Sequence, residues 1–79
     1  MTKHTLSVHL ENKAGALVRV AALFSRRGFN IESLAVGPAD EPGTSHMSIA
    51  VCVDERPLEQ IVQQLSKLVN VISVQESSA

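Results

Sequence analysis

The sequence has few of the residues that form disulfides or metal sites, the cross-links with which small domains often stabilise their fold. Cys52 is the single cysteine, so an internal disulfide is impossible, which fits a reducing compartment. The histidines, His4, His9 and His46, show no metal-ligand spacing, and we expect no metal site. A chain of 79 residues has room for one domain and buries only about 60% of the surface that its unfolded form exposes. Pairing with another chain is therefore the expected source of further stability.

Charge of one sign, aromatic residues and long apolar runs are scarce as well. Basic and acidic residues nearly balance at a formal net charge of -1, which argues against nucleic-acid or anionic-membrane binding through bulk charge. No stretch is long enough to cross a membrane, and the first residues lack the apolar segment of a signal peptide. We therefore expect a soluble, cytoplasmic protein. Only Phe24 and Phe29 are aromatic, so valine, leucine, isoleucine and alanine must build the core.

Two hydrophobic periodicities alternate along the chain. Apolar and polar residues alternate strictly from Thr5 to Leu10 and again from Met47 to Asp54, which is typical of half-buried strands. Apolar residues recur at helical spacing from Leu17 to Phe24 and from Leu58 to Leu68. Together the patterns predict strands over about residues 4–10, 29–37, 45–53 and 70–76, and helices over about residues 15–27 and 55–68.

Residues that favour helix ends and turns stand at the boundaries of these segments. Asn12 is a candidate N-cap for the first helix, and Gly28 should end that helix. Asp54, followed by Pro57, is typical of the start of the second helix. A Pro-Gly pair at Gly43 predicts a turn between the two middle strands.

The order strand, helix, strand, strand, helix, strand predicts one domain over residues 1–79. Right-handed crossovers in the two βαβ units place both helices on the same face of a four-stranded antiparallel sheet. The sequence therefore predicts an α+β fold of the ferredoxin-like βαββαβ type.

Small, barely charged residues are predicted on the sheet face that the helices leave open. Such a surface either receives another layer of protein or is simply exposed, and the alternation leaves both interpretations open. In the last strand, Ile72 and Val74 are predicted to share the opposite face. The residues assigned to the open face are Thr5, Ser7, His9, Ser48, Ala50, Cys52, Val71 and Ser73.

The turn at residues 12–17 is the strongest candidate for a binding site. A glycine near the start of a helix costs about 1 kcal/mol relative to alanine, and Gly15 should therefore have a reason to be there. Its missing Cβ would let an anion reach backbone N–H groups. The alternative, which is the commoner case for an arbitrary domain, is that Asn12 caps the helix and Gly15 only relieves a tight bend. After the helix, Asn30 lies between two large apolar residues. An amide donates and accepts hydrogen bonds, so Asn12 and Asn30 could each contact a zwitterion.

Two long segments resemble a known family. Leu6–Val20 and Leu23–Leu34 closely resemble the small regulatory subunits of acetolactate synthase, also called acetohydroxyacid synthase, and residues 57–61 and 64–71 match the same family. The resemblance covers nearly the whole chain, and Leu23–Leu34 is far more specific than a general ACT-domain signature. It implies an ACT domain, a ferredoxin-like module that binds amino acids. It also implies a non-catalytic regulatory subunit that mediates feedback control of valine, leucine and isoleucine biosynthesis.

The resemblance also implies where the effector binds and which molecules take part. In this family the effector, most often valine, binds where two ACT domains pair, so a homodimer is expected. One chain supplies the turn after the first strand and the other supplies the start of the second strand. The expected partner is the catalytic large subunit, which would carry thiamine diphosphate, Mg and FAD, whereas no cofactor is expected in this chain. The effector site implied in this way comprises Asn12, Ala14, Gly15, Ala16, Leu17, Asn30 and Ile31.

The chain departs from the family pattern in two respects, and other functions compete with the one implied. Family subunits usually continue into a second, C-terminal domain, which is expected to be absent here, and Ala14 stands where many ACT domains have proline. The main alternative is an assembly module that dimerises and docks on the catalytic subunit without a ligand. An acylphosphatase-type enzyme would need an arginine where the loop offers Lys13. An RNA-binding module would need exposed aromatic residues on the central strands.

Overall fold

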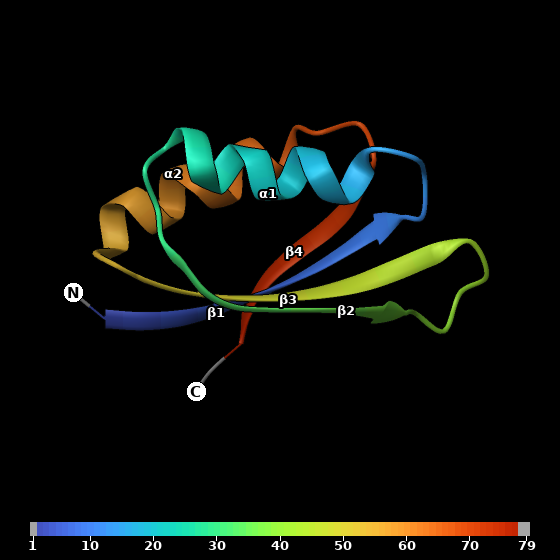
Figure 1. The fold of residues 1–79 in the computed structure, drawn as a ribbon, viewed down its shortest axis with the longest axis horizontal. Coiled ribbons are helices and arrows are strands. Elements are labelled where there is room, and N and C mark those ends of the chain that lie inside the picture. The colour runs from blue at the N-terminus through green and yellow to red at the C-terminus, as the bar shows by residue number, and fades with distance from the viewer. Residues whose placement is uncertain (1, 78–79) are drawn as a thin grey trace.

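The computed structural model describes residues 2–77, except for the side chains of Glu55 and Ser77, and has the predicted order of elements. The strands form one four-stranded antiparallel sheet in the order β2-β3-β1-β4, and both helices lie on the same face of it (Figure 1). The ferredoxin-like α+β prediction is confirmed. The elements are β1 (Thr2–Glu11), α1 (Ala16–Arg26), β2 (Ile31–Pro38), β3 (Thr44–Val53), α2 (Glu55–Ser66) and β4 (Val71–Ser77).

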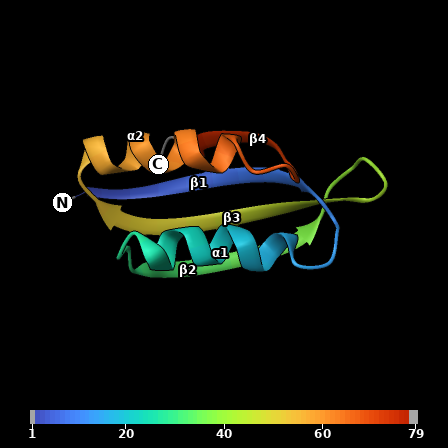
Figure 2. The same cartoon turned by 90° about the horizontal axis from the view of Figure 1, so that it is seen from above.

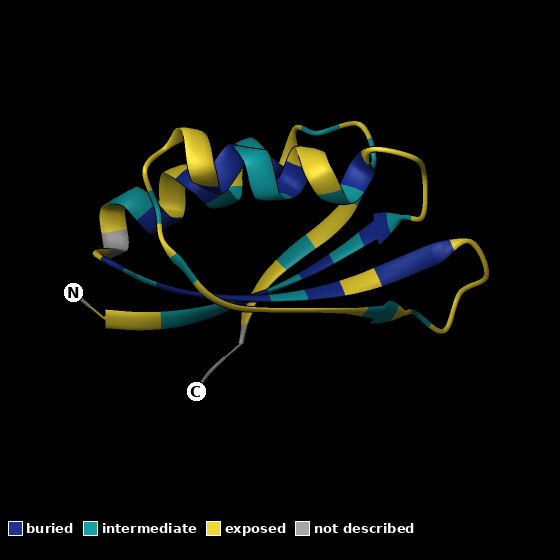
Figure 3. Cartoon of the chain, viewed as in Figure 1, coloured by how far each residue is buried: buried dark blue, intermediate teal, exposed yellow. Residues whose placement is uncertain are grey.

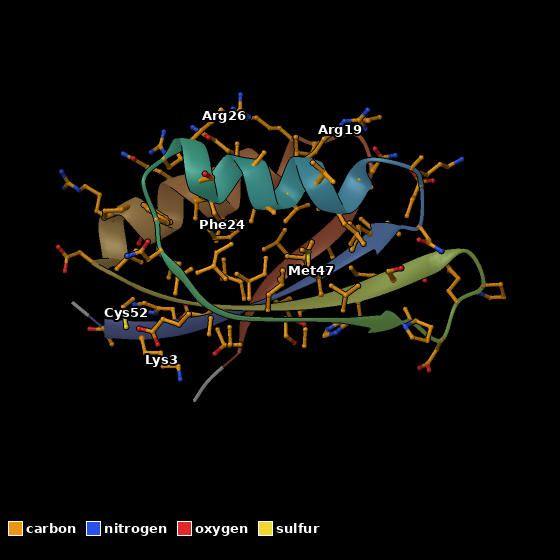
Figure 4. The ribbon with its side chains drawn as sticks, in the orientation of Figure 1. Lys3, Arg19, Phe24, Arg26, Met47 and Cys52 are labelled. Carbon is orange, nitrogen blue, oxygen red and sulfur yellow. The ribbon has the colours of Figure 1, made fainter. Side chains whose placement is uncertain are left out.

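The core lies between the sheet and the two helices. Seen from above, α1 lies over the β2 and β3 side of the sheet, and α2 lies over the β1 and β4 side (Figure 2). Phe24 from α1 and Met47 from β3 both point into the space between the layers (Figure 4). Buried positions follow one face of each helix and of the two central strands (Figure 3). The buried cluster comprises Leu6, Val8, Leu10, Ala16, Val20, Leu23, Phe24, Met47, Ile49, Val51, Val53, Leu58, Ile61 and Leu65.

The two ends of α1 are both set by glycines in the left-handed region. Gly15, with φ 82°, is the N-cap, and no side chain caps this end, so the prediction that Asn12 is the N-cap is wrong. Gly15 takes the position because only glycine adopts such a φ without strain. At the other end, Gly28 has φ 77° and donates its N–H to the carbonyl of Ser25 at 3.0 Å, so the predicted stop is confirmed.

The start of β4 departs from the predicted alternation. The pairing with β1 shifts register between His9 and Leu10, so that Leu10 pairs with Val71 and His9 pairs with Ser73. Ile72 is the additional residue of this irregularity and is 50% exposed, whereas Val71 packs against the core together with Val74. The predictions that Val71 lies on the open face and that Ile72 shares a face with Val74 are therefore wrong. A single inserted residue reverses the alternation on one side of it.

The open face of the sheet carries the other small residues, as predicted. Register pairs Ser7 with Ser48 and His9 with His46 across β1 and β3, and the hydroxyl of Ser7 is hydrogen-bonded to Nε2 of His46. A hollow of about 360 Å³ on this face is lined by Ser7, His9, His46 and their neighbours. Neither helix in the described part of the chain is long and apolar enough to span a bilayer.

Candidate functional site

The turn between β1 and α1 is fixed by backbone hydrogen bonds at its first half. The N–H of Asn12 donates to the carbonyl of Gly43 at 2.9 Å, which ties the turn to the β2–β3 hairpin. The N–H of Lys13 donates to the carbonyl of Glu11 at 2.9 Å, and the N–H of Ala16 donates to the carbonyl of Lys13 at 3.1 Å. The chain therefore leaves β1 and enters α1 through a turn with a defined backbone path.

The second half of the turn presents unpaired backbone donors. Within residues 2–77 no backbone carbonyl accepts from the N–H groups of Gly15, Leu17 or Val18, whereas the N–H of Arg19 donates to the carbonyl of Gly15 at 3.0 Å. These donors lie at the start of an amphipathic helix, where the partial positive charge of the helix dipole is greatest. This end of α1 can therefore accept a carboxylate.

Gly15 has a structural reason to be glycine apart from any ligand. Its φ of 82° would strain any side chain, although a Cβ at this position would meet no atom within 4 Å. Of the other predicted turn residues, Asn12 and Ala14 are exposed, Ala16 is buried and Leu17 is half-buried against the core. A side chain introduced at Gly15 would point into open space above the unpaired donors, so the position can be tested by substitution.

The second predicted group of site residues, Asn30 and Ile31, lies where β2 begins. Asn30 is exposed in the connection before the strand, and Ile31 is half-buried and pairs with Val51. The connection is anchored by Phe29, whose ring centroid is 6.2 Å from that of Phe24. Asn30 lines a hollow of about 360 Å³ together with Phe29, Glu32, Cys52 and neighbouring residues. Apolar groups, the Asn30 amide and the carboxylates of Glu32 and Asp54 all line this hollow, so it can receive a small amphipathic or cationic group.

The structure does not bring the two predicted groups together within one chain. The turn precedes α1 and Asn30 follows it, and the two lie at opposite ends of that helix (Figure 1). Because α1 has 11 residues, its ends are about 16 Å apart at the usual rise per residue. A single small amino acid cannot span that distance, so the residues of one chain do not form a complete site.

Cys52 lies close to the second group but has the character of an inert thiol. A hydrogen bond to the side chain of Glu32, together with burial and the negative charge of Glu32, raises the pKa of Cys52 above its usual value. Lys3, which pairs with Cys52 across β1 and β3 and lies beside it in Figure 4, opposes this shift only in part. The thiol therefore stays protonated at neutral pH and is not an activated nucleophile. Residues 2–77 also contain no cluster of three or more metal-ligating side chains.

A polar network beside the turn was missed by the sequence reasoning. Nη1 of Arg19 donates to Oδ1 of Asn70 at 2.7 Å, and Nδ2 of Asn70 donates to Oε1 of Glu11 at 3.2 Å. The N–H of Glu11 also donates to the carbonyl of Asn70 at 2.8 Å. No local pattern could have indicated this network, because Asn70 lies 51 positions after Arg19 and 59 positions after Glu11.

Comparison with known proteins gives one consistent family. A family model described as an AHAS small subunit-like ACT domain matches residues 6–73. The chain is 63% identical over 73 residues to the acetolactate synthase small subunit of Mycobacterium avium, covering 92% of this chain and 44% of that protein. It is 53% identical over 74 residues to the probable acetolactate synthase small subunit of Archaeoglobus fulgidus, covering 94% of this chain and 46% of that protein.

Solved structures agree with these relatives. The acetolactate synthase small subunit from Thermotoga maritima superposes with a TM-score of 0.88 at 43% identity, covering 96% of this chain and 47% of that one. The ACT domain of GTP pyrophosphokinase from Chlorobium tepidum has a TM-score of 0.83 at 18% identity, covering 96% of this chain and 97% of that one, and supports the fold alone. The chain thus spans somewhat less than half the length of the small subunits that it matches.

Proposed function

The chain belongs to the family of acetohydroxyacid synthase small subunit-like ACT domains, and from that premise we propose that it is a non-catalytic regulatory module of acetolactate synthase. It binds a branched-chain amino acid, most readily valine, between two copies of the chain. Occupancy of this shared site alters how the copies pair and so mediates feedback control of the catalytic large subunit. A coupling free energy of about 1 to 3 kcal/mol is enough to change the activity of a bound enzyme several-fold or more. Thiamine diphosphate, Mg and FAD belong to the large subunit.

The separation of the two groups of site residues carries this proposal. In one chain the turn and Asn30 lie at opposite ends of α1, but β2 is an edge strand whose outer side is free in the described chain. Pro38 and Leu10 both pair with Ser45, so the ends of β2 and β1 lie at the same level of the sheet. If β2 pairs antiparallel with β2 of a second copy, the start of the partner's β2 lies beside the end of β2 in the first chain. The partner's Asn30 then comes close to the turn of the first chain.

Apolar residues along this edge support the same pairing. Leu34 and Val36 lie on the helix side of β2 and are 47% and 46% exposed, which is unusual for large apolar residues on the covered face of a sheet. On α1, Leu17 lies on the flank opposite Arg19, which faces Asn70, and the neighbouring Val18 is 69% exposed. A second copy paired along β2 would bury this strip and extend the sheet.

The donors of the turn define how the amino acid would be held. Its carboxylate receives hydrogen bonds from the free N–H groups of Gly15 and its helical neighbours, aided by the helix dipole. The side-chain carbonyls of Asn12 and of the partner's Asn30 accept from the ammonium group. Leu17 and the partner's Ile31 enclose an isopropyl-sized side chain. Every polar group of the zwitterion is then matched, which a buried ligand requires.

Substitution of Gly15 tests the site directly. Calorimetric titration with valine should give binding to the wild-type chain and no measurable binding to Gly15→Asp, because the new carboxylate repels that of the ligand and fills its space. Gly15→Asn has nearly the same shape and the same positive φ but no charge, and it should retain more affinity than Gly15→Asp. Both variants should fold, since nothing lies within 4 Å of the new Cβ, and both should lose a similar part of their stability because each places a side chain at a φ of 82°. Equal affinity of all three proteins for valine would contradict the site.

An assembly module without a ligand is the second candidate, and the exposed apolar strip along β2 is the observation that favours it. Thermal unfolding with valine, leucine and isoleucine separates the two functions. A specific ligand at about 100 times its Kd stabilises the folded chain by about 2.7 kcal/mol, whereas an assembly module gains nothing. A dimeric chain whose unfolding temperature no branched-chain amino acid raises would favour assembly.

A further inference from the structure

Asn70 connects the two sides of the β1–α1 turn, although it comes from the distant loop between α2 and β4. Its backbone carbonyl and its side-chain amide both contact Glu11, the last residue of β1. Its side-chain oxygen contacts Arg19, in the first turns of α1, at 2.7 Å. One residue therefore fixes the position of the strand before the turn relative to the helix after it.

The chemistry of the contacts suits an amide at this position. Oδ1 accepts from the Arg19 guanidinium while Nδ2 donates to the Glu11 carboxylate, and the two ends of one amide group do both in one orientation. Rotating the amide by half a turn would set a donor against a donor and an acceptor against an acceptor. The 2.7 Å bond from Arg19 has the short length of a charge-assisted hydrogen bond, whereas the 3.2 Å bond to Glu11 lies at the long end of the range. The half-buried amide is thus held in one orientation by two charged groups on either side of the turn.

Among residues 2–77 no other side-chain hydrogen bond supports the turn in this way. Backbone hydrogen bonds hold Asn12 to Gly43 and Lys13 to Glu11, and the N–H of Ala16 donates to the carbonyl of Lys13, but none of these bonds joins the body of α1 to the end of β1. The free donors of Gly15 and its helical neighbours are in the second half, and their positions depend on where α1 begins relative to β1. Within residues 2–77, the bond from Arg19 to Asn70 is the side-chain hydrogen bond that joins α1 to the loop contacting the end of β1.

We propose that Asn70 is a positioning residue for the amino-acid site, holding the N–H donors at the start of α1 at the separation from β1 that a bound carboxylate needs. This inference rests on the proposed function, because it concerns the affinity of that site. Asn70 touches no part of the ligand. It acts through Glu11 and Arg19, and a binding constellation held less closely than about 0.5 Å loses much of its value.

The test compares valine affinity in the 79-residue chain and its variants at a temperature well below unfolding. Asn70→Asp keeps the shape and the acceptor for Arg19 but sets a carboxylate against that of Glu11. Valine should bind about 2- to 30-fold more weakly, the range typical of residues that modulate a site without touching its ligand. The free-protein amide resonances of Gly15, Leu17 and Val18 should shift in the same variant, which shows a change of the turn itself.

A double variant supplies the rescue. Glu11→Gln combined with Asn70→Asp exchanges amide and carboxylate between the two positions, so the glutamine amide can donate to the new aspartate while Arg19 keeps its acceptor. Valine affinity should return most of the way to the wild-type value. As a matched control, Gln60→Ala removes the 2.6 Å bond that Nη2 of Arg27, the residue after α1, donates to the amide oxygen of Gln60 on α2, and should leave affinity unchanged.

The possible outcomes separate this inference from the proposed function. If the wild-type chain binds none of valine, leucine and isoleucine, both fail. If the wild type binds and Asn70→Asp binds equally well, the site stands and the positioning role is overturned. If Asn70→Asp lowers only the unfolding temperature, or the double variant fails to restore affinity, Asn70 is structural and the inference is likewise overturned.

Discussion

The turn at residues 12–17 and the start of β2 at residues 29–31 are the two parts of the proposed site, and the chain holds them very differently. Hydrogen bonds from the hairpin, from the end of β1 and from the α2–β4 loop converge on the turn. The start of β2 is held by the N–H of Phe29, which donates to the carbonyl of Phe24 at 3.0 Å, by the ring contact of these two residues, and by a strand whose outer edge is free in the described chain. In the proposed site, one chain would therefore preform the half that receives the carboxylate, whereas the second half would gain its setting when another chain covers β2.

The largest effect is expected when β2 is prevented from pairing with β2 of a second copy, because the second half of the proposed site depends on that pairing. Leu34→Asp introduces a charge near the middle of β2, and in the proposed pairing of β2 with β2 the same charge on the second copy lies close to it. Like charges at an interface cost several kcal/mol, so the dissociation constant of the dimer should rise by more than about 100-fold. Valine binding should be lost together with the dimer. Analytical ultracentrifugation measures the first effect and calorimetry the second.

A matched control exists on the other edge of the sheet. Ile72 on β4 is 50% exposed, close to the 47% of Leu34, so Ile72→Asp introduces the same charge at similar exposure on the opposite edge. It should leave the dimer intact. If Ile72→Asp dissociates the dimer and Leu34→Asp does not, the chains pair through β4 and the shared site proposed here is wrong.

A smaller effect should distinguish how the two halves are held. Phe29→Ala removes the half-buried ring that packs on Phe24 and should lower the free energy of unfolding by about 2 kcal/mol. Hydrogen exchange should accelerate most at residues 29–31, while the hydrogen-bonded amides of Asn12, Lys13 and Arg19 keep their protection relative to global unfolding. Equal acceleration in both segments would mean that Phe29 stabilises the whole fold rather than this half of the site.

The smallest expected effect on stability concerns Asn12. Because Gly15 and not Asn12 is the N-cap, Asn12→Ala should change the free energy of unfolding by less than about 0.5 kcal/mol, in contrast to the roughly 1 kcal/mol of a lost cap. Its effect should appear instead as weaker valine binding. Thermal unfolding and calorimetry on the same variant measure both. A clear loss of stability with unchanged affinity for valine would show that Asn12 has a purely structural role.

Most of the fold could be predicted because its signals are local. The alternation from Thr5 to Leu10 and the helical spacing from Leu58 to Leu68 are properties of adjacent residues, and β1 and α2 formed where they were expected. Gly28 ends α1 as predicted, because a positive φ after a helix is a local requirement. The grouping of site residues into a turn and a strand start was also accessible from the sequence, through resemblance to a family.

The errors arose where a local pattern competed with a contact to another part of the chain. Asn12 is a good N-cap by residue type, but its N–H is engaged by the carbonyl of Gly43 and α1 begins three residues later than such a cap requires. Ile72 fits the alternation of β4, but the pairing of β4 with β1 shifts register at His9, and this shift leaves Ile72 exposed. In both cases a partner far along the chain decided the outcome.

The sequence by itself determined the order of the elements, the composition of the core and the family, because periodicity and residue identity are carried by neighbouring positions. Tertiary structure alone decided that Asn70 contacts Glu11 and Arg19 on either side of the turn and that the register of β4 exposes Ile72. The physical reason is that a hydrogen-bonded network or a strand register depends on how separate elements pack. No window of neighbouring residues contains that information.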